Sequence, residues 1–264
     1  MIFLTFIICA VYLLATFFRL FEKIQDKPMT WHGMVSFALG LLLHFVAVIE
    51  MIAHGSATQA FHVPLVLSTA GFVMASGCML LEIQWKETIF SLFILPVVIP
   101  LVIISNFSGT FLQGPLYQGW LFMFHVFSSV AGECFFFFSS ISGGIYLYVL
   151  RRLKKKHHMR AVKIFPPLTR LESLIAYFSL IGFIFFTLGL VAGGYWSMEA
   201  FGSIRFSESK RVLSFVVWTL FGTLLVSRKL GQLSGSKHAI LAILGFLSSL
   251  ALIFSGGTRM HWYP

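Results

Sequence analysis

The chain has 264 residues, of which 58% are apolar and 11% are charged. Its mean hydropathy of +0.90 is too high for one water-soluble globule of that length, because many apolar side chains would remain in water. These values exclude a soluble domain and indicate an integral membrane protein. The net charge of +10 does not require nucleic acid as a partner, since basic residues also mark the cytoplasmic loops of membrane proteins.

Apolar runs of about 20 residues recur along the chain and predict an all-α polytopic membrane protein with about eight transmembrane helices. We expect one membrane domain over residues 1–264. The first run has no basic segment before it, so it should remain as a helix and not be cleaved as a signal peptide. Pro96 and Pro100 should kink the fourth helix. The predicted spans are 2–20, 31–53, 64–81, 88–105, 120–150, 173–195, 212–226 and 239–256.

The basic residues predict the orientation, with both termini on the outer, periplasmic side of a bacterial inner membrane. In that orientation 15 of the 19 Lys and Arg residues, Arg19 among them, belong to cytoplasmic loops, as the positive-inside rule requires. The basic run from Arg151 to Lys163 touches the membrane, where a topological anchor is favoured over binding of anionic lipid head groups. The four remaining basic residues, which fall on the outer side, are Arg205, Lys210, Arg211 and Arg259.

The sequence contains no motif for thiol redox chemistry or for the common kinds of hydrolytic catalysis. Cys9, Cys78 and Cys134 lie in predicted spans without a C-x-x-C pair, which favours small apolar fillers over thiol redox chemistry. Catalytic triad, phosphate-loop and zinc-protease patterns are missing, so we do not expect an enzyme. Thr169 and Glu172 have the spacing of a capping box, which predicts the start of the sixth helix.

Two histidines are predicted near the outer ends of well-separated helices. His125 lies five residues after Trp120, about 7 Å along the fifth helix, and His261 follows the eighth. The aromatic, glycine-bearing stretch 193–208 would form a loop on the same side. Imidazole ligates haem iron, and flat aromatic side chains can cover a porphyrin. Placement alone favours interface anchoring over haem binding, because histidine and tryptophan are both common at membrane interfaces.

The remaining histidines have simpler explanations in most cases. His32, His157, His158 and His238 should be solvated or interfacial on the cytoplasmic side. His44 lies within the second span, about 18 Å from His32 along the helix. It would be a second iron ligand, a proton-relay group or a polar contact between helices.

Three segments resemble the cytochrome c assembly family. The strongest resemblance covers residues 168–218 and includes Leu168-Thr169-Arg170-Leu171-Glu172, Ile181-Gly182-Phe183 and Thr187-Leu188-Gly189-Leu190-Val191-Ala192-Gly193-Gly194-Tyr195-Trp196, where the family has T-x-G-x-x-x-G before a tryptophan-rich outer loop. In that loop Phe201 and Gly202 stay close to the family pattern, whereas Arg205 and Ser207 stand at two tryptophan positions. The segments that end at His125 and His261 resemble the family's outer histidines.

The resemblance implies a haem-handling protein of cytochrome and haem biogenesis, closest to the HemX-like branch with eight spans. It would bind haem b at the outer face, with His125 and His261 as axial ligands. The implied partners are membrane lipid, other cytochrome assembly proteins or apocytochrome. The alternatives are a haem-free assembly or regulatory subunit, and a small-molecule transporter suggested by His44, Glu50 and Glu133. The candidate cofactor-binding residues are His125, His261, Trp196, Phe201, Phe206 and His44.

Overall fold

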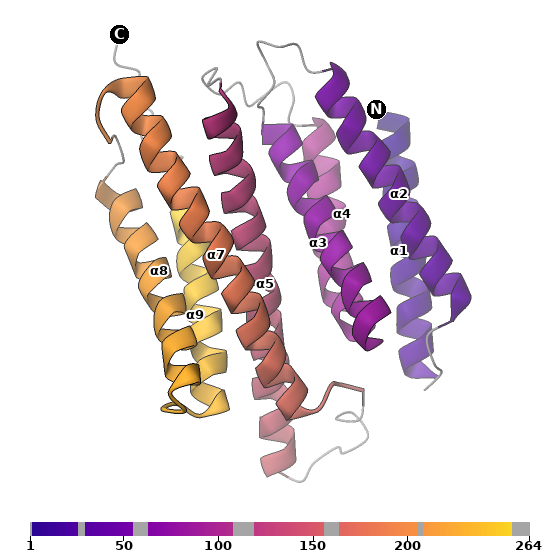
Figure 1. The fold of residues 1–264 in the computed structure, drawn as a ribbon. Helices are drawn as coiled ribbons and strands as arrows, with labels where there is room; N and C mark the ends of the chain where they lie inside the picture. Colours follow the sequence, from indigo (N-terminus) through magenta and orange to yellow (C-terminus); the bar gives the residue numbers. More distant parts are fainter. Residues whose placement is uncertain are drawn as a thin grey trace. The chain divides into compact units, whose positions relative to one another are not determined.

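The computed structural model describes residues 2–25, 30–54, 63–107, 119–155, 164–204 and 208–254. Regular structure in these ranges is helical throughout, and eight helices are long and apolar enough to cross a membrane (Figure 1). The predicted all-α polytopic fold is thereby confirmed. The helices are α1 (Ile2–Ile24), α2 (Trp31–His54), α3 (Val63–Trp85), α4 (Ile89–Phe107), α5 (Trp120–Lys154), α7 (Leu168–Phe201), α8 (Glu208–Lys229) and α9 (Gly235–Phe254).

The start of α7 differs from the sequence prediction. The helix begins at Leu168, and its N-cap residue is Pro167, which is extended and makes no side-chain cap hydrogen bond. The spacing of Thr169 and Glu172 therefore does not form a capping box. The Glu172 carboxylate instead accepts a hydrogen bond from the Tyr146 hydroxyl of α5 at 2.9 Å. The side chain that was predicted to cap α7 therefore binds another helix.

The end of α7 also differs, because the helix continues past Trp196 to Phe201. The next residue, Gly202, has a left-handed backbone with φ 66°, and its N–H bonds the Met198 carbonyl at 2.9 Å. Glycine adopts this conformation without a steric penalty and commonly terminates helices. Trp196 consequently belongs to a helix, where the sequence predicted an outer loop.

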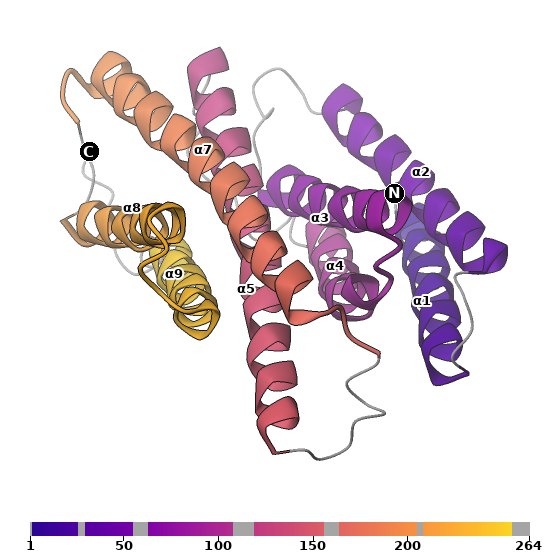
Figure 2. The same ribbon diagram turned by 60° about the horizontal axis from the view of Figure 1, so that its bottom comes forward.

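The described helices group into two compact units, residues 1–119 and 120–264. In the first unit α1 packs against α2 and α4, and α3 packs against α2 and α4. In the second unit α5 packs against α7 and α9, and α8 also packs against α7 and α9 (Figure 2). The expectation of one membrane domain over the whole chain stays a prediction. Cys9, Cys78 and Cys134 are buried and form no disulfide among the described residues. Their assignment as small apolar fillers stays a prediction.

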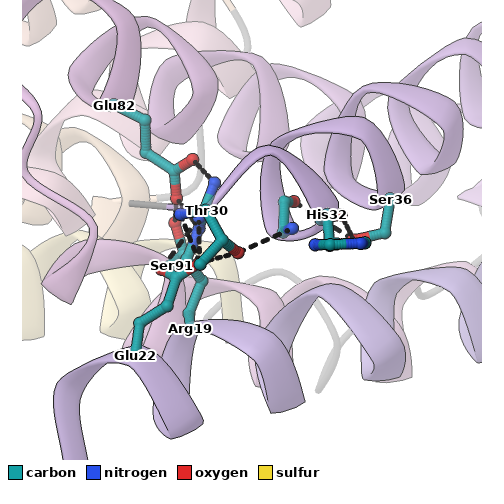
Figure 3. Close-up of polar contacts among 8 residues, drawn as sticks. Arg19, Glu22, Thr30, His32, Ser36, Glu82 and Ser91 are labelled. Atoms are coloured by element: carbon teal, nitrogen blue, oxygen red, sulfur yellow. Dashed lines mark hydrogen bonds and ion pairs between the residues drawn. The ribbon is translucent and has the colours of Figure 1, made fainter. Parts of the chain in front are cut away.

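The first unit contains a buried ionic cluster around Arg19 (Figure 3). The Arg19 side chain has no exposed surface, which corrects its assignment to a cytoplasmic loop. Its Nε and Nη2 donate to the Glu82 carboxylate of α3 at 3.0 and 2.5 Å, and its Nη1 donates to Glu22 at 2.9 and 3.0 Å. Such two-pronged guanidinium–carboxylate pairing compensates for the loss of hydration that burial imposes.

Two hydroxyl groups complete the cluster. Ser91 of α4 donates to Glu82 Oε1 at 2.5 Å. Thr30, just before α2, donates to Glu22 Oε1 through its backbone N–H at 2.8 Å and its hydroxyl at 2.5 Å. The cluster thus connects α1, α3, α4 and the start of α2 at one end of the unit.

Candidate functional site

The second unit is organised around an antiparallel seam between α5 and α7, which lie side by side (Figures 1 and 2). Facing positions on each helix recur at alternating steps of three and four residues, the spacing of coiled-coil packing. Many are Gly or Ser, which let membrane helices approach closely. The facing pairs are Phe122 and Trp196, His125 and Gly193, Ser129 and Gly189, Gly132 and Phe186, Phe136 and Gly182, Ser139 and Ser179, and Tyr146 and Glu172.

His125 occupies this seam near the end at which α5 begins and α7 ends, which we call the Trp120 end. Its Nδ1 lies 2.7 Å from the carbonyl oxygen of Gly189. Because a carbonyl only accepts, Nδ1 carries the proton, and in the neutral ring Nε2 keeps its lone pair. A histidine that ligates a metal typically donates its other N–H to a carbonyl or carboxylate in this way. His125 therefore has the hydrogen bonding of a metal-ligating imidazole.

Trp196 lies one turn beyond His125 along the seam. Its ring packs against Phe122 of α5, with centroids 4.9 Å apart and planes inclined by 48°. This places a flat aromatic pair next to the histidine, although from a helix and not from a loop. Lys210 lies in the first turn of α8, and six residues separate the start of that helix from the end of α7.

Of the residues that the sequence predicted for the outer site, the structure describes the side chains of His125 and Trp196, and both lie in the α5–α7 seam near the Trp120 end. Phe201 ends α7, but its side chain is outside the described part. Phe206 and His261 also lie outside the described residues. Within the described ranges, no three His, Cys, Asp or Glu side chains gather to hold a metal ion. His261 as a second axial ligand stays a prediction.

His44 lies in the core of the first unit with no exposed surface. Its Nδ1 is 3.1 Å from the Tyr12 hydroxyl of α1, and its Nε2 is 3.2 Å from the Ser68 hydroxyl of α3. Both ring nitrogens therefore contact hydroxyl groups of neighbouring helices. These contacts make His44 a polar contact between helices, one of the three roles weighed from the sequence. Its roles as a second iron ligand and as a proton-relay group stay predictions.

Glu133 of α5 is the ionisable residue that burial leaves least satisfied in the second unit. Its Oε2 is buried without a hydrogen-bond partner among the described residues. One such oxygen identifies no substrate path, and the transporter alternative gains no further support from it.

Of the two expectations for His238, solvated or interfacial, the first is wrong, because only 5% of the residue is exposed. Its Nε2 lies 3.2 Å from the Ser227 hydroxyl, within a polar group at the end of the second unit opposite the Trp120 end. There Arg228 also donates to the Glu172 backbone carbonyl at 2.9 Å. The short connection between α8 and α9 brings these residues together. His32, in contrast, is exposed as predicted.

Sequence reasoning missed Gly189 and Gly193 as site residues. Both belong to the quoted glycine pattern, but the pattern alone does not say what the glycines face. Their four-residue spacing equals that of His125 and Ser129, which they oppose on α5. Matching these two spacings on antiparallel helices is the signal that predicts the contact.

Comparisons with known proteins show the family of this chain. The family described as "Cytochrome C assembly protein" matches residues 1–258. Over 67 residues the chain is 42% identical to the cytochrome c biogenesis protein CcsA of Lotus japonicus, and 40% identical to those of Cuscuta exaltata and Pelargonium hortorum. These matches cover 25% of this chain and 21 to 22% of each relative, so the matched part spans about a fifth of the relatives' length. The chain belongs to the cytochrome c assembly family.

Proposed function

We propose that this protein acts in cytochrome c biogenesis by binding haem b at the Trp120 end of its second unit and presenting it to an assembly partner. The single observation that carries the proposal is the 2.7 Å contact between His125 Nδ1 and the Gly189 carbonyl oxygen. This contact leaves Nε2 as the nitrogen that can ligate iron. The family match and the names of the relatives supply the biological setting.

The described residues fit such a group. His125 supplies one axial nitrogen, and the Trp196 and Phe122 rings supply flat apolar surface of the kind that packs against a porphyrin. Haem, the iron porphyrin of cytochromes, would be the ligand that this protein carries and passes on. His261 is proposed as the second axial ligand. The role of the chain's own residues is to hold, orient and release this cargo, so we propose a binding protein and not an enzyme.

The proposed setting is a bacterial inner membrane, with the Trp120 end facing outward. The partners would be other assembly proteins or apocytochrome at that face, and lipid around the helices. The positive-inside pattern supports this orientation, because Arg151 and Arg228, at the opposite end of that unit, would then lie toward the cytoplasm. Membership of the HemX-like branch belongs to the same proposal.

The test is a haem titration of the purified full chain in detergent, followed through Soret absorbance. Wild-type protein should bind haem, and the His125→Ala, His261→Ala double variant should lose it, since removal of both ligands frees the iron. His32→Ala is the matched control, because His32 is exposed in the first unit. Absence of a Soret band in wild-type protein after haem supplementation would contradict the proposal. Stable co-purification with membrane partners would then favour the haem-free subunit.

A further inference from the structure

We infer that Gly193 is a positioning residue that holds the His125 imidazole in its ligand-competent tautomer; this inference rests on the proposed haem site. Gly193 is buried on α7 directly opposite His125 of α5. The ring packs against the bare Cα of Gly193, which keeps Nδ1 within reach of the Gly189 carbonyl one turn earlier on the same helix. Both glycines therefore position the same ring: Gly193 leaves room for it, and the Gly189 carbonyl accepts its Nδ1–H.

The space at Gly193 is too small for any side chain. A Cβ added there would lie 2.6 Å from His125 Nδ1 and 2.7 Å from its Cε1. Protein atoms do not approach so closely, so the imidazole would have to turn or α5 and α7 would have to separate. Either movement displaces Nδ1, which is the atom that donates to Gly189.

Other glycines of α7 make the effect separable from general crowding. Gly194 is the next residue along the chain, and a Cβ added there meets nothing within 4 Å. Gly182 lies in the same seam, where an added Cβ would be 2.6 Å from the Phe136 ring. Gly182 is about three helical turns from Gly193 on α7, so this Cβ would not approach His125. Gly182→Ala thus crowds the seam equally, but at a different ring.

The chemical consequence follows from the tautomer. While Nδ1–H is held by a carbonyl, the lone pair remains on Nε2 and the ring is oriented for one ligand direction. Without that bond the proton can occupy either nitrogen and the ring is free to turn. Loss of an outer partner of a metal-ligating histidine typically weakens metal binding about 10- to 100-fold.

The experiment compares wild-type, Gly193→Ala, Gly194→Ala and Gly182→Ala full-length proteins in detergent. Haem affinity is measured by Soret titration, thermal stability by melting, and the His125 tautomer by ¹⁵N NMR of the haem-free protein, with His125→Ala used for assignment. We expect Gly193→Ala to bind haem about 10- to 100-fold more weakly and to lose the defined Nδ1–H signal. Gly194→Ala should match wild type, and Gly182→Ala should melt lower with an unchanged tautomer.

The outcomes separate the two proposals. If wild-type protein binds no haem, the proposed function is wrong, while the NMR comparison still tests the positioning of His125. If Gly193→Ala keeps wild-type affinity and tautomer, or changes no more than Gly182→Ala, the inference is overturned.

If the Gly193→Ala protein does not accumulate, the same substitution is tested in a chain that also carries His125→Ala. In a His125→Ala chain the added methyl group meets no imidazole, so Gly193→Ala should accumulate there and cost no further thermal stability. A further loss in that background would show that Gly193 serves helix packing in general, which also overturns the inference.

Discussion

Gly143 of α5 packs so closely against Ala239 of α9 that a Cβ added to Gly143 would lie 2.9 Å from the Ala239 carbonyl oxygen. The atoms that it would meet belong to a helix backbone and cannot rotate away, so the two helices would have to separate. The adjacent Gly144 has nothing within 4 Å of the equivalent position. These neighbouring glycines provide a matched test of the contact between α5 and α9.

Gly143→Ala should lower the free energy of unfolding by about 1–3 kcal/mol, the usual cost of overpacking a close interface. Gly144→Ala should leave it unchanged or raise it by up to about 1 kcal/mol, because alanine favours helix more than glycine does. Unfolding of both variants in mixed detergent micelles measures the difference. Equal destabilisation by the two substitutions would argue against the packing described for this pair.

Arg19→Met should destabilise the first unit by about 3–5 kcal/mol, because it leaves the Glu22 and Glu82 carboxylates buried without their cation. Adding Glu22→Gln and Glu82→Gln should recover much of the loss by removing the unpaired charges. Lys23→Met is the control, since Lys23 lies on the same helix outside the cluster. Melting midpoints and yields from the membrane provide the measurement, and a triple variant no better than Arg19→Met would contradict the ionic explanation.

His44→Leu should lower stability without changing haem binding. The substitution leaves the Tyr12 and Ser68 hydroxyls without their shared partner, and each unsatisfied buried group costs about 1–3 kcal/mol. Adding Tyr12→Phe should recover part of the loss. Soret titration and melting of the same preparations check both statements. A weakened or shifted Soret band in His44→Leu would instead make His44 an iron ligand.

Cysteine labelling should establish the orientation in the membrane. The native cysteines are buried, so background labelling should be low. Glu199→Cys, on the exposed surface near the end of α7, should react with an impermeant maleimide added to intact spheroplasts. Gln232→Cys, exposed between α8 and α9, should react only in inverted vesicles. The reverse pattern would place the Trp120 end in the cytoplasm and remove the proposed outer site.

The helical class and the approximate spans could be predicted from the sequence, because a hydrocarbon layer requires about 20 consecutive apolar residues and satisfied backbone hydrogen bonds. Both requirements are local, so they can be recognised without knowing which helices meet. The end of α7 was also encoded locally, at Gly202, although the expectation of an outer loop led to an earlier boundary. Helix existence was therefore easier to predict than helix ends.

The contacts that define the site were decided only by the tertiary structure. Arg19 meets Glu82 across 63 residues of chain, and His125 meets Gly189 across 64. No short motif states such a partner, because the partner depends on which helix faces pack and in which register. The sequence alone determined that the chain spans a membrane and that it carries histidines near predicted helix ends. The packing of α5 against α7 decided that His125 donates Nδ1–H to a carbonyl. Two helices approach closely where small residues face each other, and this register places Gly189 and Gly193 against His125.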